Sequence, residues 1–398
     1  MTSNPPDAQV RAVIPEPSAR LRNARKILDA AWDAGAVSAA ELMAATGLTR
    51  VTVLNQAREL ADAGWLREAQ DSRALGQYST GRPALRYELE TDTRAVAGID
   101  AGQHRISAVL ADPHGTVLAR AQADIHPEAP AAQRVQVVAQ LLRELGGSQA
   151  SRTLDALVVG VPAPVDSHGF SPSDANGFWG RMNPDWQGQL GEFTGLIQVE
   201  NDANLAARAE LGRGAEGSFA ALLVGERLGA GTVVDGQLLR GAHGMAGEMR
   251  FLTHVQGVGS AAGLGPVARQ LANDALAAGR SSSLAGLEQR GTQQIFAAAH
   301  AHDELACEIL EALGLRLARI AAVIAGFAGL ETIIVSGAMA ATLAPVIQIA
   351  QRELEREPAP VRLSASSLGA EAVVHGALCS ALDLMRATAP NLPTRKAP

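Results

Sequence analysis

A chain of 398 residues is longer than one ordinary domain and is expected to form two or three. Hydrophobic residues make up 47% of it and charged residues 19%, which is the composition of a packed soluble protein and excludes a disordered chain. The net charge of -7 excludes a strongly basic protein, so any nucleic-acid binding must be inferred from sequence pattern and not from charge.

The ends of the chain carry no packing pattern. Residues 1–18 contain several prolines and few apolar residues, which predicts a disordered tail, and residues 391–398 are expected to form a second tail. The polar N-terminal segment has no signal-peptide core, so we expect a cytoplasmic protein.

One long uncharged stretch needs an explanation other than a membrane span. Residues 332–351 are interrupted by Gly337 and Pro345, which predicts a strand, a tight turn and a helix, with no membrane contact. The two cysteines, Cys307 and Cys379, lie in apolar, helix-like contexts and are expected to be buried, reduced thiols.

Residues 19–92 follow the order helix, helix, turn, helix, wing. Helical patterns cover residues 21–34, 39–45 and 50–63, with Gly47 ending the second helix and Thr49 capping the third. Two short strands are expected at residues 65–68 and 86–89. This order is typical of a winged helix-turn-helix DNA-binding domain.

The third helix of this segment has two distinct faces. Val53, Ala57 and Leu60 are spaced to pack inward. The opposite face carries residue types suited to base edges and, near the helix start, to phosphates. The candidate DNA-binding residues of this helix are Thr49, Arg50, Val51, Thr52, Leu54, Asn55 and Arg58. The alternative is a three-helix interaction domain that does not bind DNA.

A second candidate DNA contact lies in the expected wing. Arg82 stands between Gly81 and Pro83, and an extended arginine of this kind fits a narrow minor groove. The alternative is a solvated turn.

From residue 96 onward, apolar strand patterns alternate with helices, which predicts an α/β body. Strands are expected at residues 96–100, 106–110, 116–119, 156–161, 197–199, 219–224, 232–234 and 333–335, with a helix at residues 131–145.

This body carries a set of short motifs in a fixed order. They are Gly98-Ile99-Asp100-Ala101-Gly102, Gly160-Val161-Pro162, Glu200-Asn201-Asp202, Gly229-Ala230-Gly231 and Gly247-Glu248. Together they resemble the ROK family of repressors and sugar kinases. The resemblance implies that residues 93–390 form a two-lobed, actin-like ATPase (ribonuclease H-like) domain with a ligand cleft between the lobes.

The resemblance also implies which residues act on a ligand. Asp202 occupies the position of the kinase general base, and Asn201, Asp202 and Glu248 occupy sugar-binding positions. Two phosphate-binding loops depart from the family pattern: Gln103 and His104 replace a glycine and a hydroxyl residue, and residues 225–227 place Glu226 on the phosphate path. We therefore expect no catalytic residue, no bound nucleotide cofactor and no enzyme activity.

The family's zinc site is not expected either. Its cysteine-rich run corresponds to residues 255–265, which contain no cysteine, and Phe251 replaces a histidine of the family pattern. The ligand of the cleft stays open between a sugar, another small molecule and none.

The leading hypothesis is a DNA-binding repressor of carbohydrate-related genes, acting as a homodimer or tetramer on palindromic DNA. One alternative is an active sugar kinase with a DNA-binding appendage, and another is a scaffold that dimerises and docks a protein.

Overall fold

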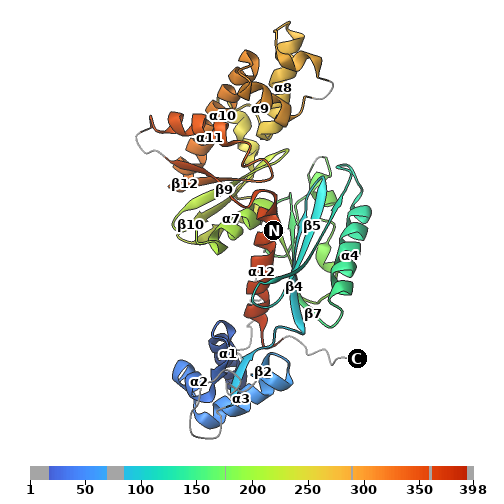
Figure 1. Ribbon diagram of the computed structural model, residues 1–398, viewed down its shortest axis with the longest axis vertical. Helices are drawn as coiled ribbons and strands as arrows, with labels where there is room; N and C mark the ends of the chain where they lie inside the picture. Colours follow the sequence, from blue (N-terminus) through green and yellow to red (C-terminus); the bar gives the residue numbers. More distant parts are fainter. Residues whose placement is uncertain (1–17, 70–84, 175, 288–289, 358–360, 392–398) are drawn as a thin grey trace, which may run out of the picture. The chain divides into compact units, whose positions relative to one another are not determined.

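The computed structural model describes residues 18–69, 85–174, 176–287, 290–357 and 361–391 (Figure 1). The chain divides into two units, residues 1–93 together with 388–398, and residues 94–387. The C-terminal boundary differs from the expected residue 390, because residues 388–391 belong to the first unit. There the Ala389 carbonyl accepts a hydrogen bond from Arg25 Nη1 at 3.2 Å.

The first unit is a bundle of short helices with a three-stranded antiparallel sheet. Its elements in chain order are α1 (Ala19–Trp32), β1 (Val37–Ser38), α2 (Ala39–Thr46), α3 (Arg50–Asp62), β2 (Leu66–Glu68) and β3 (Arg86–Leu89). The sheet has the order β1-β3-β2. The three helices and the strands β2 and β3 follow in the order that the sequence pattern predicts. Among the described elements of this unit, the two-residue strand β1 is the one that the pattern did not predict.

Local interactions fix the turn between α2 and α3. Ser38 and Glu41 form a capping box at the start of α2, and Gly47 ends that helix in the left-handed conformation, with φ of 69°. Thr49 caps α3, since its side chain accepts a hydrogen bond from the Thr52 N–H at 3.3 Å. The predicted cap and turn are therefore confirmed.

The second unit contains two lobes, each built on a five-stranded mixed sheet. The first lobe comprises β4 (Arg94–Ala101), β5 (Arg105–Ala111), β6 (Val117–Asp124), α4 (Ala131–Ser148), β7 (Thr153–Val161), α5 (Phe178–Met182), α6 (Trp186–Gln189), β8 (Ile197–Asn201) and α7 (Asp202–Gly212). The second comprises β9 (Phe219–Val224), β10 (Leu228–Val234), β11 (Gln237–Leu239), α8 (Leu264–Ala277), α9 (Thr292–His300), α10 (Glu304–Ala328), β12 (Thr332–Ser336), α11 (Ala344–Leu354), β13 (Arg362–Ala365) and α12 (Ala372–Thr388).

The two sheets have the same topology. Their strand orders are β6-β5-β4-β7-β8 and β11-β10-β9-β12-β13. In each sheet the first three strands of the lobe are antiparallel neighbours. The fourth strand pairs in parallel with the first, and the fifth pairs in parallel with the fourth. This duplicated sheet is the ribonuclease H-like architecture of actin-like ATPases, so the predicted fold class is confirmed.

Helices cover both faces of each sheet. In the first lobe α4 lies against one face of the sheet (Figure 1). The other face is covered by α12, which follows the second sheet in the chain and approaches β4 so closely that a Cβ on Gly98 would lie 2.5 Å from the Leu378 N. In the second lobe α8 to α11 pack on one face through a large apolar core, and α7 packs on the other. The uncharged stretch of residues 332–351 forms strand β12, a turn and the start of helix α11, as predicted. No helix in the described part of the chain is long and apolar enough to cross a membrane.

The expectation of two buried cysteines is wrong for Cys307. Its side chain is exposed, while Cys379 is half-buried. Cys307 follows Leu305 by two positions on α10, so it points about 200° away from that buried residue. An apolar helix therefore still places this thiol on its outer face.

Candidate DNA-reading helix and ligand cleft

Helix α3 has the two faces that its sequence predicts. Val53, Ala57 and Leu60 are buried. Arg50, Val51, Asn55 and Arg58 are exposed on the other side. Within the described residues, the side chains of Arg50, Asn55 and Arg58 make no hydrogen bond or ion pair. A face of unpaired donors is available for an external partner.

The remaining candidate residues of this helix are half-buried or make hydrogen bonds with one another. Leu54 is half-buried, and the hydroxyls of Thr49 and Thr52 lie 2.9 Å apart and bond to each other. These threonines stabilise the start of α3, whatever else they contact. Arg82 lies outside the described residues.

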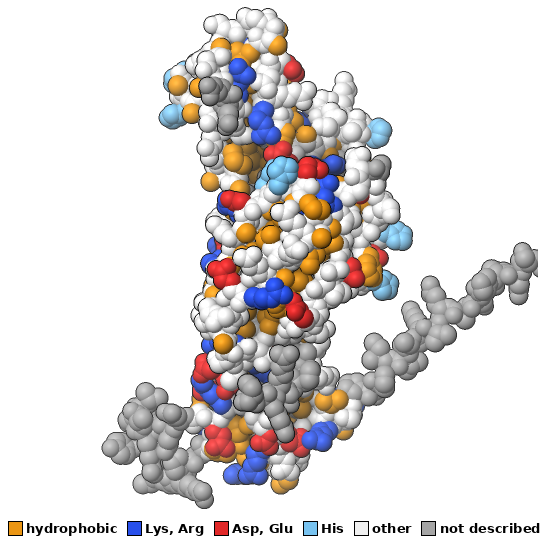
Figure 2. All heavy atoms as spheres, turned by 90° about the vertical axis from the view of Figure 1, so that its right-hand side faces the viewer, with side chains coloured by type: hydrophobic (Ala, Val, Ile, Leu, Met, Phe, Trp, Pro, Cys, Tyr) orange, Lys and Arg blue, Asp and Glu red, His pale blue; other side chains and the backbone are white. Residues whose placement is uncertain are grey.

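Charge around α3 is mixed. Glu59 is held by Arg20 at 3.0 Å and by Gln56 at 2.7 Å, so its carboxylate is neutralised within the unit. On the face of the molecule shown in Figure 2, acidic and basic side chains alternate without forming a patch of one sign. Recognition through α3 would therefore depend on particular side chains and not on bulk charge.

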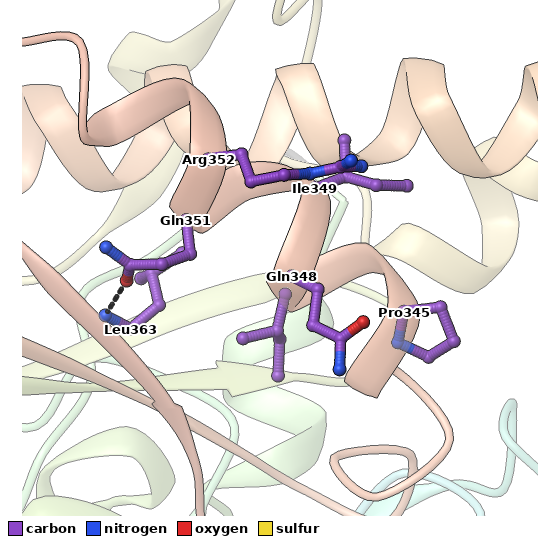
Figure 3. Close-up of a pocket in the computed structure, with 7 residues that line it drawn as sticks. Pro345, Gln348, Ile349, Gln351, Arg352 and Leu363 are labelled. Carbon is purple, nitrogen blue, oxygen red and sulfur yellow. Dashed lines mark hydrogen bonds between the residues drawn. The ribbon is translucent and has the colours of Figure 1, made fainter.

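One surface hollow is lined by none of the candidate site residues that the sequence predicts. It is formed by α11 and β13, where Leu363 N–H donates to Gln351 Oε1 at 2.8 Å and Arg352 is the one charged lining residue (Figure 3). It brings together none of the expected chemistry.

A second hollow, of about 620 Å³, is the cleft between the two lobes of residues 94–387. The first lobe contributes Asp100, Asn201 and Asp202 to its lining, and the second contributes Glu248 and the turn between β9 and β10. The structure thus brings together all three residues that the family resemblance assigned to ligand binding.

Close approach between the backbones of β10, α7 and the segment before Glu248 brings these cleft residues together. A Cβ on Gly231 of β10 would lie 2.1 Å from the Ala203 carbonyl oxygen of α7, and a Cβ on Gly247 would lie 1.8 Å from the Ala230 carbonyl oxygen. Only glycine fits at such distances. The segment carrying Glu248 then pairs with β10 at Gly229, beside the start of α7 and Asp202.

Three carboxyl groups share the cleft, and two of them, Asp100 and Glu248, raise the pKa of the third, Asp202. The pKa of Asp202 is raised to about 8, chiefly by burial and then by the charge of Asp100. Burial raises the pKa of Asp100 to about 7, against the attraction of Arg134. Burial also raises the pKa of Glu248, opposed by Arg227 and Arg250. Burial therefore favours the protonated forms of Asp100 and Asp202, and a protonated carboxyl group can both donate and accept hydrogen bonds.

Both polar atoms of the Asn201 side chain make hydrogen bonds within the fold. Its Oδ1 caps α7 by accepting from Asn204 N–H at 3.1 Å, and its Nδ2 donates to the Ala163 carbonyl at 3.1 Å. Glu200 is buried and bonds Arg240 and Asn204, both at 2.9 Å. These contacts hold the turn that presents Asp202.

The first altered phosphate loop, which carries Gln103 and His104, is anchored by a buried arginine. Arg134, which is fully buried on α4, donates to the carbonyl of Ala101 at 2.9 Å and to that of Gly102. Gln103 and His104 line the cleft just beyond this anchor. The loop is therefore a fixed wall of the cleft that carries two side chains larger than glycine.

The second altered loop, between β9 and β10, carries a surface ion pair. Glu226 lies 3.4 Å from Arg269 of α8, and both side chains are exposed. This pairing reduces the negative charge that the sequence placed on the phosphate path. Arg227 forms no ion pair within the described residues and remains a positive group at the cleft.

Phe251 lies outside the lining of the cleft, whereas Asp100 and Trp179 belong to it. Phe251 is 42% exposed and does not line the cleft, so its ring leaves the pocket unfilled. Trp179 lines the cleft, with the Arg250 guanidinium 4.3 Å from its ring centroid. Asp100 and Trp179 were missed as site residues, although an aspartate that ends an apolar strand before Gly102 was a usable signal for the first.

No group of three histidine, cysteine, aspartate or glutamate side chains is placed to hold a metal ion in the described residues. In the segment where the family pattern has its zinc ligands, Gly265 lines the cleft and His254 is exposed.

These features define a class of protein: a small helical unit with a three-stranded sheet, joined to a two-lobed, actin-like body with a cleft between its lobes. The ROK family model matches residues 96–383, and the chain belongs to the ROK family.

Curated relatives include both kinases and repressors. A glucokinase from Halalkalibacterium halodurans is 26% identical over 269 residues, which cover 61% of this chain and 80% of the glucokinase. A xylose repressor from Caldicellulosiruptor bescii is 24% identical over 232 residues, covering 57% of this chain and 57% of the repressor. The chain thus matches little more than half of that repressor.

Solved structures show the same fold. A ROK family transcriptional regulator, described as a homologue of the E. coli MLC protein, matches with a TM-score of 0.70 at 23% identity, covering 92% of this chain and 96% of its own. A ROK family glucokinase from Streptomyces griseus, in complex with glucose and AMPPNP, matches with a TM-score of 0.56 at 23% identity, covering 73% of this chain and 99% of its own.

Proposed function

We propose that this chain is a DNA-binding transcription regulator, a repressor of carbohydrate-related genes, with a body that senses a ligand and has lost kinase activity. The observation that carries the proposal is the outer face of α3, where Arg50, Asn55 and Arg58 are exposed and make no hydrogen bond or ion pair to any residue that the structure describes. Arginine and asparagine form paired hydrogen bonds with guanine and adenine in the major groove. The similarity to a xylose repressor supports this function.

DNA selection tests the proposal. We expect the full chain to enrich a two-fold symmetric site from random duplexes, and Arg58→Ala to weaken binding to that site by about 5- to 100-fold per contacted half-site. Fluorescence anisotropy measures the affinity at fixed salt. Arg362→Ala removes the same charge from an exposed position of the second unit and should leave affinity unchanged. Absence of any enriched sequence would contradict the proposal.

We propose that the cleft binds the effector through Asp202 and Glu248, with Asn201 supporting the turn that presents Asp202. Vicinal hydroxyls of a sugar suit two neighbouring carboxyl groups. A thermal-shift screen of mono- and disaccharides tests this role, because a ligand of the folded state raises the melting temperature. If no compound shifts wild type more than Asp202→Asn, the cleft is not a sugar site.

An active sugar kinase is the second candidate. The glucokinase similarity favours it, as does the raised pKa of Asp202, since a general base works best with a pKa near the operating pH. The side chains of Gln103, Glu226 and Arg227 in the two phosphate loops oppose it. ATP consumption measured with a sugar panel distinguishes the two, and we expect none above that of Asp202→Asn.

A further inference from the structure

Val51 is the one apolar residue of α3 that is fully open to solvent. Its side chain is 70% exposed, whereas Val53, Ala57 and Leu60 are buried and Leu54 is half-buried. Valine is a poor helix former because its β-branched side chain is restricted in a helix, and its apolar surface gains nothing from contact with water. Folding of the first unit therefore does not account for valine at this position.

The surroundings of Val51 are suited to nucleic acid. Val51, Asn55 and Arg58 follow one another at helical spacing along a single stripe, and Arg50 precedes them. This stripe contains no acidic residue, and the nearest acidic residue along the chain, Glu59, is neutralised by Arg20. Its charge complements the phosphates that border the major groove.

The position of Val51 in the helix matters as well. Residues near the start of a recognition helix reach base edges most directly. The backbone there is fixed by the Thr49 cap and by the hydrogen bond between the Thr49 and Thr52 hydroxyls. A stiff valine side chain on a fixed backbone loses little conformational freedom when it makes a contact.

We propose that Val51 reads a thymine in each operator half-site by packing its two methyl groups on the thymine 5-methyl. The thymine methyl is the one apolar group that base pairs present in the major groove. This inference rests on the proposed DNA-binding function, and it names one base and the residue that selects it.

The test removes the proposed methyl contact in two ways, once by changing the DNA and once by changing the protein. Starting from the selected operator, each thymine is replaced symmetrically by deoxyuridine, which lacks only the 5-methyl group. Affinities are then measured for wild type and for Val51→Ala. At one thymine per half-site we expect deoxyuridine to weaken wild-type binding about fourfold per half-site, as for loss of one buried methyl, and to leave Val51→Ala nearly unaffected.

Controls separate the possible results. Alanine is a better helix former than valine, so Val51→Ala should stay folded, and its affinity for non-specific DNA should equal that of wild type. Val117→Ala, the same change at an exposed valine of β6 in the second unit, should retain the full deoxyuridine effect at the same thymine.

If wild type binds specifically but every deoxyuridine effect is the same in Val51→Ala, this inference is wrong and the DNA-binding function stands. If wild type selects no sequence, both fall together. A Val51 that contacts a protein partner instead would give the first of these results.

Discussion

Asp202 stands at the start of α7, where its carboxyl group shares the cleft with Asp100 of the same lobe and Glu248 of the other. Its Oδ1 accepts the Ala203 N–H at 2.7 Å, but Asp100 and Glu248 both disfavour its ionised form. A carboxyl group whose pKa is raised on folding destabilises the folded protein progressively as pH rises from the unfolded pKa to the folded one. For Asp202 this interval runs from 3.8 to about 8.

Replacing Asp202 should therefore change the pH dependence of stability. Asparagine resembles the protonated acid, so we expect Asp202→Asn to melt at a higher temperature than wild type. The difference should grow from pH 5 to pH 8 and reach about 2 °C or more. Differential scanning fluorimetry across this range measures it, with the exposed Asp274→Asn as control. A difference that does not vary with pH would show that Asp202 is not buried among like charges.

Residue roles were predictable from sequence where they depend on local spacing. The inward set of Val53, Ala57 and Leu60 followed from helical periodicity alone. The exposure of Cys307 did not, because an alanine-rich helix offers no clear polar face by which to orient it. The placement of Asp202 beside Glu248 required the family resemblance, since 46 positions separate them in the chain.

At the scale of elements, apolar strands were predictable and the shortest edge strands were not. The uninterrupted apolar run of β9 gave its bounds correctly, because a strand covered on both faces must be apolar throughout. The short strands β1, β11 and β13 were missed. Each lies at the edge of its sheet and has only two to four residues, too few for a side-chain pattern, so pairing with a neighbour defines it.

Contact between β10 and α7 provides an element-scale prediction. In Gly231→Ala the new methyl group would press on the Ala203 carbonyl, so β10 and α7 must separate. We expect a loss of about 1–3 kcal/mol in the free energy of unfolding, and loss of any ligand-induced thermal shift. Urea denaturation measures the first effect.

The matched control is Gly146→Ala in α4, where an added Cβ meets no atom within 4 Å. This change should be neutral or stabilise by up to about 1 kcal/mol. Equal destabilisation by both substitutions would show that β10 and α7 do not depend on close approach at Gly231.

At the scale of the whole molecule, the two lobes repeat one strand order without a visible repeat in sequence. The connection from β11 to β12 contains three helices, α8 to α10, whereas α4 alone connects β6 to β7. Such unequal insertions hide the duplication from any search for a fixed period. The cleft, which belongs to both lobes, was therefore predictable only from the ROK resemblance.

A protection experiment on genomic DNA tests the central claim that this chain is a DNA-binding regulator. The full chain is footprinted at moderate salt over the promoters that flank its own gene, in the presence of excess non-specific DNA. The account predicts one protected region with two-fold symmetric halves, separated by one or more helical turns. Uniform protection, or none at concentrations where the folded protein is fully soluble, would contradict it.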